Sequence, residues 1–226
     1  MESTNSTRIK QAEDKYLADT YARYDVALVS GNGVWATDAD GKEYIDFTSG
    51  IGVNSLGFCD PGWVAAVSGQ AGKLQHASNL FYTEPCTSAA EKLIAHTGLC
   101  NVFFGNSGAE ANEGAIKAAR KYSHVKYGDG RAEIITLEGS FHGRTIATIT
   151  ATGQDNYHKD FNPFLQGFVY ACANDIEGIR DKISDRTCAI MVEFVQGEGG
   201  VIELSEGFVN EITKICAERD ILLIAD

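Results

Sequence analysis

Beyond about Pro61 the chain alternates short β-branched or aromatic runs with segments of helical period, and this alternation constrains the fold most strongly. The expected strands are 102–104, 133–137, 188–195 and 221–225, and the expected helices are 61–75, 85–96, 109–122 and 206–219. The last strand is apolar throughout, as expected when both faces of a sheet are covered. The alternation predicts an α/β fold, with a mostly parallel sheet and helices on both faces.

The first 60 residues follow a different pattern. A short helix is expected around 9–20. Two alternating runs, 34–38 and 43–47, flank the pair Asp40-Gly41. Alternating runs around Asp-Gly are typical of a β-hairpin, so we expect an N-terminal hairpin segment ahead of the α/β part.

Composition excludes several classes of partner. The net charge of −12 disfavours nucleic acid and anionic lipid. No apolar run approaches the roughly 18 residues of a membrane span, and the first residues lack the apolar stretch of a secretory signal. The six cysteines form no C-x-x-C pair, which predicts reduced, mostly buried thiols and no metal site. We therefore expect a cytoplasmic protein that binds small molecules.

A turn of small residues, Gly-Asn-Ser-Gly-Ala-Glu, follows the first expected strand of the α/β part and opens directly into a helix. Backbone N–H groups and the Ser107 hydroxyl can converge there on an anion. The turn matches neither the phosphate loop of nucleoside triphosphatases nor G-x-G-x-x-G. Spacing alone leaves open both a phosphate site and a plain turn capped by Ser107.

The loop after strand 133–137 contains Phe141, His142 and Arg144. An aromatic ring there can stack on a planar ligand, and an arginine can bind a carboxylate through two hydrogen bonds. The plainer alternative is a core phenylalanine beside a surface arginine.

Carboxylates follow the two remaining strands. Glu193 lies within strand 188–195, where an acidic group needs a partner, and Glu198 lies in a loop with three glycines. Asp226 stands at the tip of strand 221–225 and could hold a protonated ring nitrogen or cap a following helix. Because ligands bind beyond the carboxyl ends of parallel strands, these groups together form the inventory of a pyridoxal phosphate site.

From about Tyr21 onward the sequence closely resembles the class III, fold-type I pyridoxal-phosphate aminotransferases. The matching segments are 40–47 (DGKEYIDF), 106–113 (NSGAEANE), 140–145 (SFHGRT), Glu193 with 196–200 (QGEGG), and 222–226 (LLIAD). Within the family, segment 76–85 (HASNLFYTEP) is most similar to the branch whose amino donor is N-acetylornithine.

The resemblance implies a role for each candidate residue. For the cofactor, Ser107, Gly108 and Ala109 bind the phosphate, Phe141 stacks on the pyridine ring with His142 nearby, Asp226 pairs with the ring nitrogen, and Glu193 supports the site. For the substrate, Arg144 binds a carboxylate, Glu198 tunes which substrate is accepted, and Tyr21 makes a contact from the N-terminal segment.

The resemblance also implies a domain organisation and an activity. Residues 1–60 correspond to the N-terminal segment of a small domain, and 61–226 to the first part of a large cofactor-binding domain, in a homodimer. The implied reaction is amino transfer from N-acetylornithine to 2-oxoglutarate in arginine biosynthesis. Transaminases of succinylornithine, ornithine or 4-aminobutyrate remain alternatives.

One part of the family pattern is missing. The lysine that binds the cofactor covalently in the family lies beyond Asp226, and none of the eleven lysines present matches its motif. We therefore expect the front part of a longer protein, with no catalytic residue and little activity of its own.

A truncated, inactive remnant that binds cofactor or dimerises is the alternative from another class. A dinucleotide-dependent dehydrogenase is disfavoured because G-x-G-x-x-G is absent.

Overall fold

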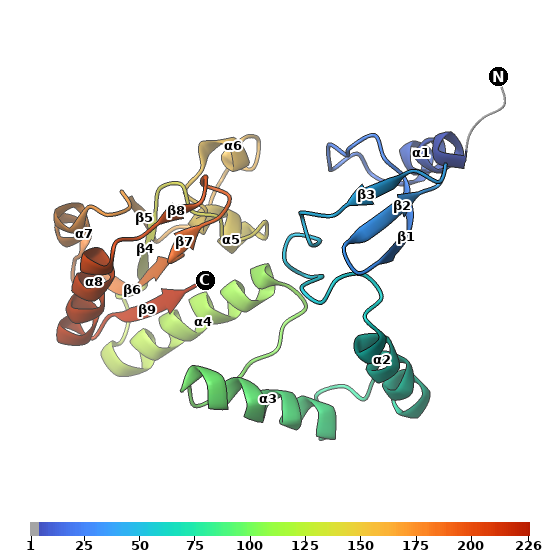
Figure 1. Ribbon diagram of the computed structural model, residues 1–226. Coiled ribbons are helices and arrows are strands. Elements are labelled where there is room, and N and C mark those ends of the chain that lie inside the picture. Colours follow the sequence, from blue (N-terminus) through green and yellow to red (C-terminus); the bar gives the residue numbers. More distant parts are fainter. Residues whose placement is uncertain (1–4) are drawn as a thin grey trace. The chain divides into compact units, whose positions relative to one another are not determined.

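The computed structural model describes residues 5–226 and divides the chain into two compact units, with the boundary between Ser88 and Ala89 (Figure 1). Helix α3 (Glu84–Thr97) runs across this boundary. The N-terminal unit also contains helices α1 (Asn5–Tyr16) and α2 (Pro61–Lys73) and a three-stranded antiparallel sheet in the order β1-β2-β3. Its strands are β1 (Leu28–Asn32), β2 (Trp35–Asp38) and β3 (Glu43–Ile45).

The hairpin predicted around Asp40-Gly41 is confirmed as β2–β3. Gly41 has a φ of +86°, which favours glycine in the turn. Asp38 Oδ1 accepts the backbone N–H groups of Lys42 at 2.9 Å and Asp40 at 3.0 Å, and the Tyr44 hydroxyl donates to Oδ2 at 2.9 Å. The N–H of Lys42 in particular holds the pKa of Asp38 below its usual value. The side chain of Asp38 therefore fixes the turn that the sequence predicted.

The C-terminal unit is built on a four-stranded parallel sheet in the order β5-β4-β6-β9. Its strands are β4 (Glu133–Leu137), β5 (Phe168–Ala171), β6 (Thr187–Val192) and β9 (Leu222–Ala225). Its helices after α3 are α4 (Gly108–Tyr127), α5 (Ile146–Ala151), α6 (Asp155–His158), α7 (Ile176–Lys182) and α8 (Glu206–Arg219). A short antiparallel pair, β7 (Val195–Gln196) and β8 (Ile202–Glu203), follows β6.

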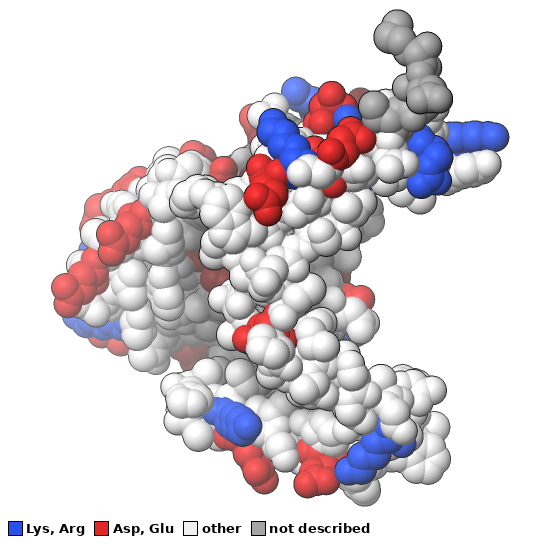
Figure 2. All heavy atoms as spheres, turned by 45° about the vertical axis from the view of Figure 1, so that its right-hand side comes forward, with Lys and Arg blue, Asp and Glu red and all other residues white. Residues whose placement is uncertain are grey.

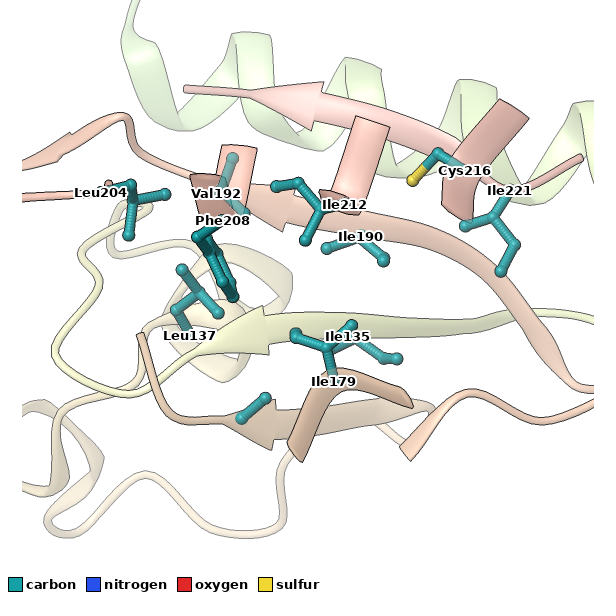
Figure 3. Packing of buried hydrophobic residues seen from close by; sticks show 11 residues of the cluster. Ile135, Leu137, Ile179, Ile190, Val192, Leu204, Phe208, Ile212, Cys216 and Ile221 are labelled. Carbon is teal, nitrogen blue, oxygen red and sulfur yellow. The ribbon is translucent and has the colours of Figure 1, made fainter. Parts of the chain in front are cut away.

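Alternate residues of β4 and β6 pack on opposite faces of this sheet. One face, drawn in Figure 3, packs against α7 and α8, and its buried residues include Ile135, Leu137, Ile190, Val192, Ile179, Phe208 and Ile212. The other face packs against α4 and α5, and its buried residues include Ile134, Ala189, Met191, Ile116, Ala119, Ala147 and Ala151. The prediction of a parallel sheet with helices on both faces is confirmed, and side-chain alternation along each strand explains it.

Two predicted strands differ from the structure. Residues 102–104 are not a strand, because in the described part of the chain they pair with no neighbouring strand. The strand predicted over 188–195 ends at Val192, and Glu193 and Phe194 leave the sheet before β7 begins.

Several elements were not anticipated, among them β5, α5 and α7. Strand β5 has only four residues, too few for alternation to be recognised. Helix α5 has the sequence IATITA, whose β-branched residues favour strands. It is nevertheless helical, because Thr145 and Thr148 form a reciprocal capping box at its start and five of its residues are buried. Helix α7 likewise depends on a cap, in which Asp175 accepts the N–H of Gly178.

The prediction of mostly buried cysteines is wrong. All six are free, but Cys59, Cys86, Cys100 and Cys172 are exposed, and only Cys188 and Cys216 are buried. Three of the exposed thiols lie in or beside α2 and α3, two helices that bury none of their residues. Apolar neighbours in the sequence therefore did not guarantee burial.

On the face shown in Figure 2, Lys and Arg side chains are interspersed with Asp and Glu rather than gathered into one basic patch. Among residues 5–226, no helix is both long and apolar enough to cross a lipid bilayer.

Ile190 is fully buried at the centre of the sheet. We expect Ile190→Ala to lower the free energy of unfolding by about 2–5 kcal/mol, since it removes methyl groups and leaves a cavity. Val125→Ala on α4, where Val125 is 72% exposed, is the control and should change it by less than about 0.5 kcal/mol. Urea denaturation measures both values, and equal effects would contradict the assigned core.

Candidate functional site

The start of α4 forms the first part of the candidate site. Ser107 is the N-cap residue, and its Oγ accepts the backbone N–H of Glu110 at 3.1 Å. Glu110 Oε2 in turn accepts the backbone N–H of Asn106 at 2.7 Å and its side-chain Nδ2–H at 2.9 Å. The N–H groups of Gly108 and Ala109 belong to the first turn, which has no carbonyl partner within the helix. These donors and the dipole of a 20-residue helix favour an anion here.

The loop after β4 lies directly against this helix start. Gly143 has a φ of +127°, and a Cβ placed on it would lie 2.7 Å from the Cβ of Ala109 and 2.7 Å from Thr148 Oγ1. Only glycine therefore fits between the loop and the helix. The Thr145 hydroxyl adds a hydrogen bond to Glu113 Oε1 on α4 at 2.6 Å. The structure thus brings together two motifs that the sequence suggested separately.

Asp226 joins both segments to the end of β9. Its Oδ2 accepts a hydrogen bond from Asn112 Nδ2 at 2.8 Å and lies 2.8 Å from His142 Nδ1. Asn112 Nδ2 also donates to the backbone carbonyl of His142 at 2.9 Å, and the Asp226 N–H donates to the carbonyl of Val192 at 2.9 Å. Neither neighbour uses the other carboxylate oxygen, Oδ1, which leaves it available to a ligand.

His142 is buried behind this carboxylate, with a side chain that is 0% exposed. Its Nε2 lies 3.2 Å from Thr136 Oγ1, and the Thr136 hydroxyl donates its proton to the carbonyl of Ala151 at 2.8 Å. Because that proton is already committed, Nε2 must carry the hydrogen that joins it to Thr136. The Nδ1 of His142 faces Asp226 Oδ2. His142 therefore contacts Asp226 and is itself shielded from solvent.

Glu193 has the partner that its place in the sequence required. Its Oε2 accepts the backbone N–H of Phe141 at 2.9 Å. Burial raises the pKa of Glu193 above its usual value, while the Phe141 N–H and the charge of His142 oppose this shift. Glu193 therefore fixes the backbone of the loop that carries Phe141.

Aromatic and charged side chains meet beside Phe141. The rings of Phe141 and Tyr157 contact edge to face, with centroids 5.2 Å apart and an angle of 63°. The guanidinium of Arg144 lies over both rings, 5.3 Å from the centroid of Tyr157 and 6.0 Å from that of Phe141. The Tyr157 hydroxyl donates to Glu198 Oε2 at 3.4 Å. Arg144 and Glu198, predicted as substrate residues, are thus linked through Tyr157.

Sequence reasoning missed Asn112, Thr136 and Tyr157. Asn112 begins the buried stripe of α4, which continues with Ile116, Ala119 and Ser123. A polar residue at the head of that stripe could have been recognised as needing a partner. Tyr157 lies in a polar stretch of the sequence with no such signal.

Tyr21 lies in the N-terminal unit and is 60% exposed, with the Arg23 guanidinium 5.7 Å from its ring centroid. Its contact with a substrate stays a prediction. Within residues 5–226, no group of three or more His, Cys, Asp or Glu side chains is arranged to hold a metal ion.

A parallel sheet whose strand ends present a helix start suited to an anion, an aromatic ring and a hydrogen-bonded carboxylate is an architecture suited to binding a phosphorylated, planar cofactor. Comparison with known families agrees. Residues 16–226 match the family described as aminotransferase class-III, and the chain belongs to this family.

Curated relatives are similar over nearly the whole chain. It is 54% identical over 222 residues to the acetylornithine aminotransferase of Haemophilus ducreyi, a match that covers 98% of this chain and 56% of that protein. It is 46% identical over 214 residues to the acetylornithine aminotransferase of Methanocaldococcus jannaschii, covering 95% and 54%. The chain spans about half the length of the curated relatives it matches.

Solved structures share the fold. The ornithine aminotransferase of Toxoplasma gondii superposes with a TM-score of 0.92 at 29% identity, covering 98% of this chain and 53% of that one. The N-acetylornithine aminotransferase of Stenotrophomonas maltophilia superposes with a TM-score of 0.78 at 36% identity, covering 96% and 52%. The predicted fold class, that of the type I pyridoxal-phosphate transferases, is therefore confirmed.

Burial of Glu193 makes a pH-dependent prediction. Its raised pKa means that the folded state resists ionisation of this carboxyl, so the stability available at low pH is lost as the pH rises through the folded-state pKa. Glu193→Gln keeps an acceptor for the Phe141 N–H. Because glutamine does not ionise, the variant avoids the free-energy cost of burying a charged carboxylate. We expect the variant to match the wild type near pH 4 and to become progressively more stable than it toward pH 8.

Urea denaturation at a series of pH values measures this difference. A difference in the free energy of unfolding that stays constant between pH 4 and pH 8 would contradict the role of burial.

Proposed function

We propose that the full-length protein is a pyridoxal-phosphate-dependent aminotransferase that moves an amino group from N-acetylornithine to 2-oxoglutarate, in arginine biosynthesis. The observation that carries the proposal is the convergence of Asp226, Asn112 and His142 beside the start of α4. The curated relatives named above support the choice of amino donor.

The residues of the C-terminal unit fit this cofactor. The N–H groups of Gly108 and Ala109 and the Ser107 hydroxyl, at the start of a long helix, suit a phosphate. A planar ring fits against Phe141, and Asp226 Oδ1 suits a protonated ring nitrogen. Gly143 keeps the loop after β4 close enough to Ala109 for one ligand to reach both.

When bound, pyridoxal phosphate supplies an electron sink for the bond-breaking step at the substrate Cα. In this proposal Asp226 holds the proton on the ring nitrogen, and Asn112 and His142 keep its carboxylate in place. Phe141 covers one face of the ring and excludes water from it. Glu193 fixes the Phe141 loop.

Arg144 binds a substrate carboxylate through its planar N–H groups, and Glu198 adjusts which substrate is accepted. We propose that Tyr21 adds a substrate contact from the N-terminal segment. Transaminases of ornithine, succinylornithine or 4-aminobutyrate use the same class of groups. Ornithine deserves a direct comparison because the ornithine aminotransferase structure superposes well.

The domain assignment is part of the same proposal. Residues 1–60 belong to the small domain and 61–226 to the first part of the large domain of a cytoplasmic homodimer. The lysine that carries the cofactor is proposed to lie beyond Asp226.

A panel of amino donors tests the reaction. We expect the full-length protein with 2-oxoglutarate to show its highest kcat/KM with N-acetylornithine, ahead of succinylornithine, ornithine and 4-aminobutyrate. Asp226→Asn should lower kcat by about 100-fold or more, since it removes the charge that stabilises the ring proton. Asp129→Asn, at a carboxylate that is 98% exposed, is the control and should leave kcat unchanged. No turnover with any of the four donors would refute the proposal.

The 226-residue chain expressed alone gives a second test. Incubated with pyridoxal phosphate and then borohydride, it should show no specific labelling of any one of its eleven lysines and no measurable amino transfer. The full-length protein treated in parallel should be labelled at a single lysine beyond Asp226. Labelling of one lysine within the chain, together with amino transfer, would overturn the proposed place of the catalytic lysine.

A further inference from the structure

Asp220, the residue that ends α8, accepts hydrogen bonds from three side chains in the last two turns of α4. Lys126 Nζ donates to its Oδ2 at 2.7 Å, and the Tyr122 hydroxyl donates to its Oδ1 at 3.1 Å. The Tyr127 hydroxyl donates to Oδ2 as well, and Lys126 Nζ also donates to the Tyr122 oxygen at 2.9 Å. We call these four residues the distal cluster, because the opposite ends of α4 and β9 carry the candidate site.

The charges of the distal cluster reinforce one another. The hydrogen bond from Lys126 is the main reason that the pKa of Asp220 falls to about 2, and the hydrogen bond to Asp220 raises the pKa of Lys126. Both groups therefore stay ionised near neutral pH. Their side chains are 48% and 38% exposed, and a pair so exposed to water adds little to global stability. The main consequence of the contact is therefore geometric.

The backbone around Asp220 is fixed as well. Asp220 has φ 52° and ψ 45°, a left-handed conformation that aspartate, asparagine and glycine tolerate best. Arg131 Nη2 donates to the carbonyls of Arg219 and Asp220, each at 2.9 Å, and Arg131 Nε donates to the carbonyl of Thr187 at 2.9 Å. The turn from α8 into β9 is thus held through both its main chain and its side chain.

Helix α4 and strand β9, which lie side by side in Figure 1, are joined at both ends and share one buried hydrophobic cluster between them. Asn112 donates to Asp226 at one end, and Lys126 donates to Asp220 at the other. The helix rises about 21 Å between Asn112 and Lys126. The extended chain from Asp220 to Asp226 covers about 20 Å. Because these lengths match, β9 cannot slide along α4 without straining the contacts at both ends.

Resting on the proposed function, we propose that Asp220 is a positioning residue for the cofactor. By its contacts with α4 it sets how far β9 extends, and so where Asp226 stands relative to the ring nitrogen. Asp220 touches neither cofactor nor substrate and acts only through Asp226. The helix start that suits the phosphate belongs to α4 itself, so the effect should be confined to the ring nitrogen.

Two ligands that differ at one ring atom test this by isothermal titration calorimetry on the cofactor-free full-length protein. One is pyridoxal phosphate, and the other is its 1-deaza analogue, in which carbon replaces the ring nitrogen and leaves no ring proton for Asp226 to hold. Asp220→Gly keeps the left-handed backbone and removes the carboxylate. We expect it to raise the Kd of pyridoxal phosphate about three- to tenfold, the range for loss of one hydrogen bond, and that of the analogue less than about twofold.

Conservative and matched variants separate positioning from a general structural effect. Asp220→Asn keeps an oxygen acceptor for the tyrosine hydroxyls but loses the charge facing Lys126, so it should raise the Kd of pyridoxal phosphate less than Asp220→Gly does. Lys214→Gln, at an exposed lysine of α8, should leave both Kd values unchanged. Ile179→Ala, at a buried residue on the other face of the sheet, should lower the free energy of unfolding without changing either Kd, because a less stable protein that is still folded binds as before.

The proposal is overturned if Asp220→Gly binds pyridoxal phosphate as the wild type does, or if it weakens the binding of both ligands equally. The proposed function fails in a different way. A wild type that binds neither ligand overturns the proposed function together with this inference. A wild type that shows the expected pattern of binding but transfers no amino group overturns the proposed reaction alone.

Discussion

The hydrogen bonds to Asp226 Oδ2 connect the three chain segments on which the candidate site depends. Asn112 comes from α4, His142 from the loop after β4, and Asp226 from the end of β9. The Asn112 amide donates to this oxygen, and the His142 ring nitrogen lies within hydrogen-bond distance of it. One of these bonds joins Asp226 to α4, the helix whose start suits a phosphate. The proposed binding of the cofactor therefore depends on the hydrogen bonds to Asp226.

Around Asp226 the site forms two layers that differ in how deeply they are buried. The layer beneath is buried and closely bonded, with His142 and Thr136 held in a chain of hydrogen bonds that ends at the carbonyl of Ala151. The layer above is more exposed and consists of Phe141, Tyr157, Arg144 and Glu198. The lower layer suits the fixed binding of a cofactor. The upper layer has charges of both signs around two rings and is the part that the proposed function assigns to the substrate.

Much of this was predictable from local pattern. The bounds of β4 and α8 matched the periodicity, because each has a buried face with regular spacing. The hairpin at Gly41 followed from turn chemistry. Burial was less predictable, because it depends on what covers a segment: Cys59, Cys86 and Cys100 are exposed, and residues 102–104 remain unpaired although their apolar sequence suits a strand. The break of β6 at Glu193 also escaped the pattern, since a polar residue in a strand does not by itself show whether the strand continues.

The sequence by itself determined the fold class, the family and the identity of the residues at the strand ends, because periodicity, glycine-rich turns and charged tips are local properties. Only the tertiary structure decided how those residues are used. It placed His142 behind Asp226, gave Asn112 its partners, and set Tyr157 between Arg144 and Glu198. These contacts join residues 13 to 114 positions apart, between Arg144 and Tyr157 at one extreme and Asn112 and Asp226 at the other. Their geometry follows from the parallel sheet, which brings the ends of separate strands to one edge, and no local sequence pattern records it.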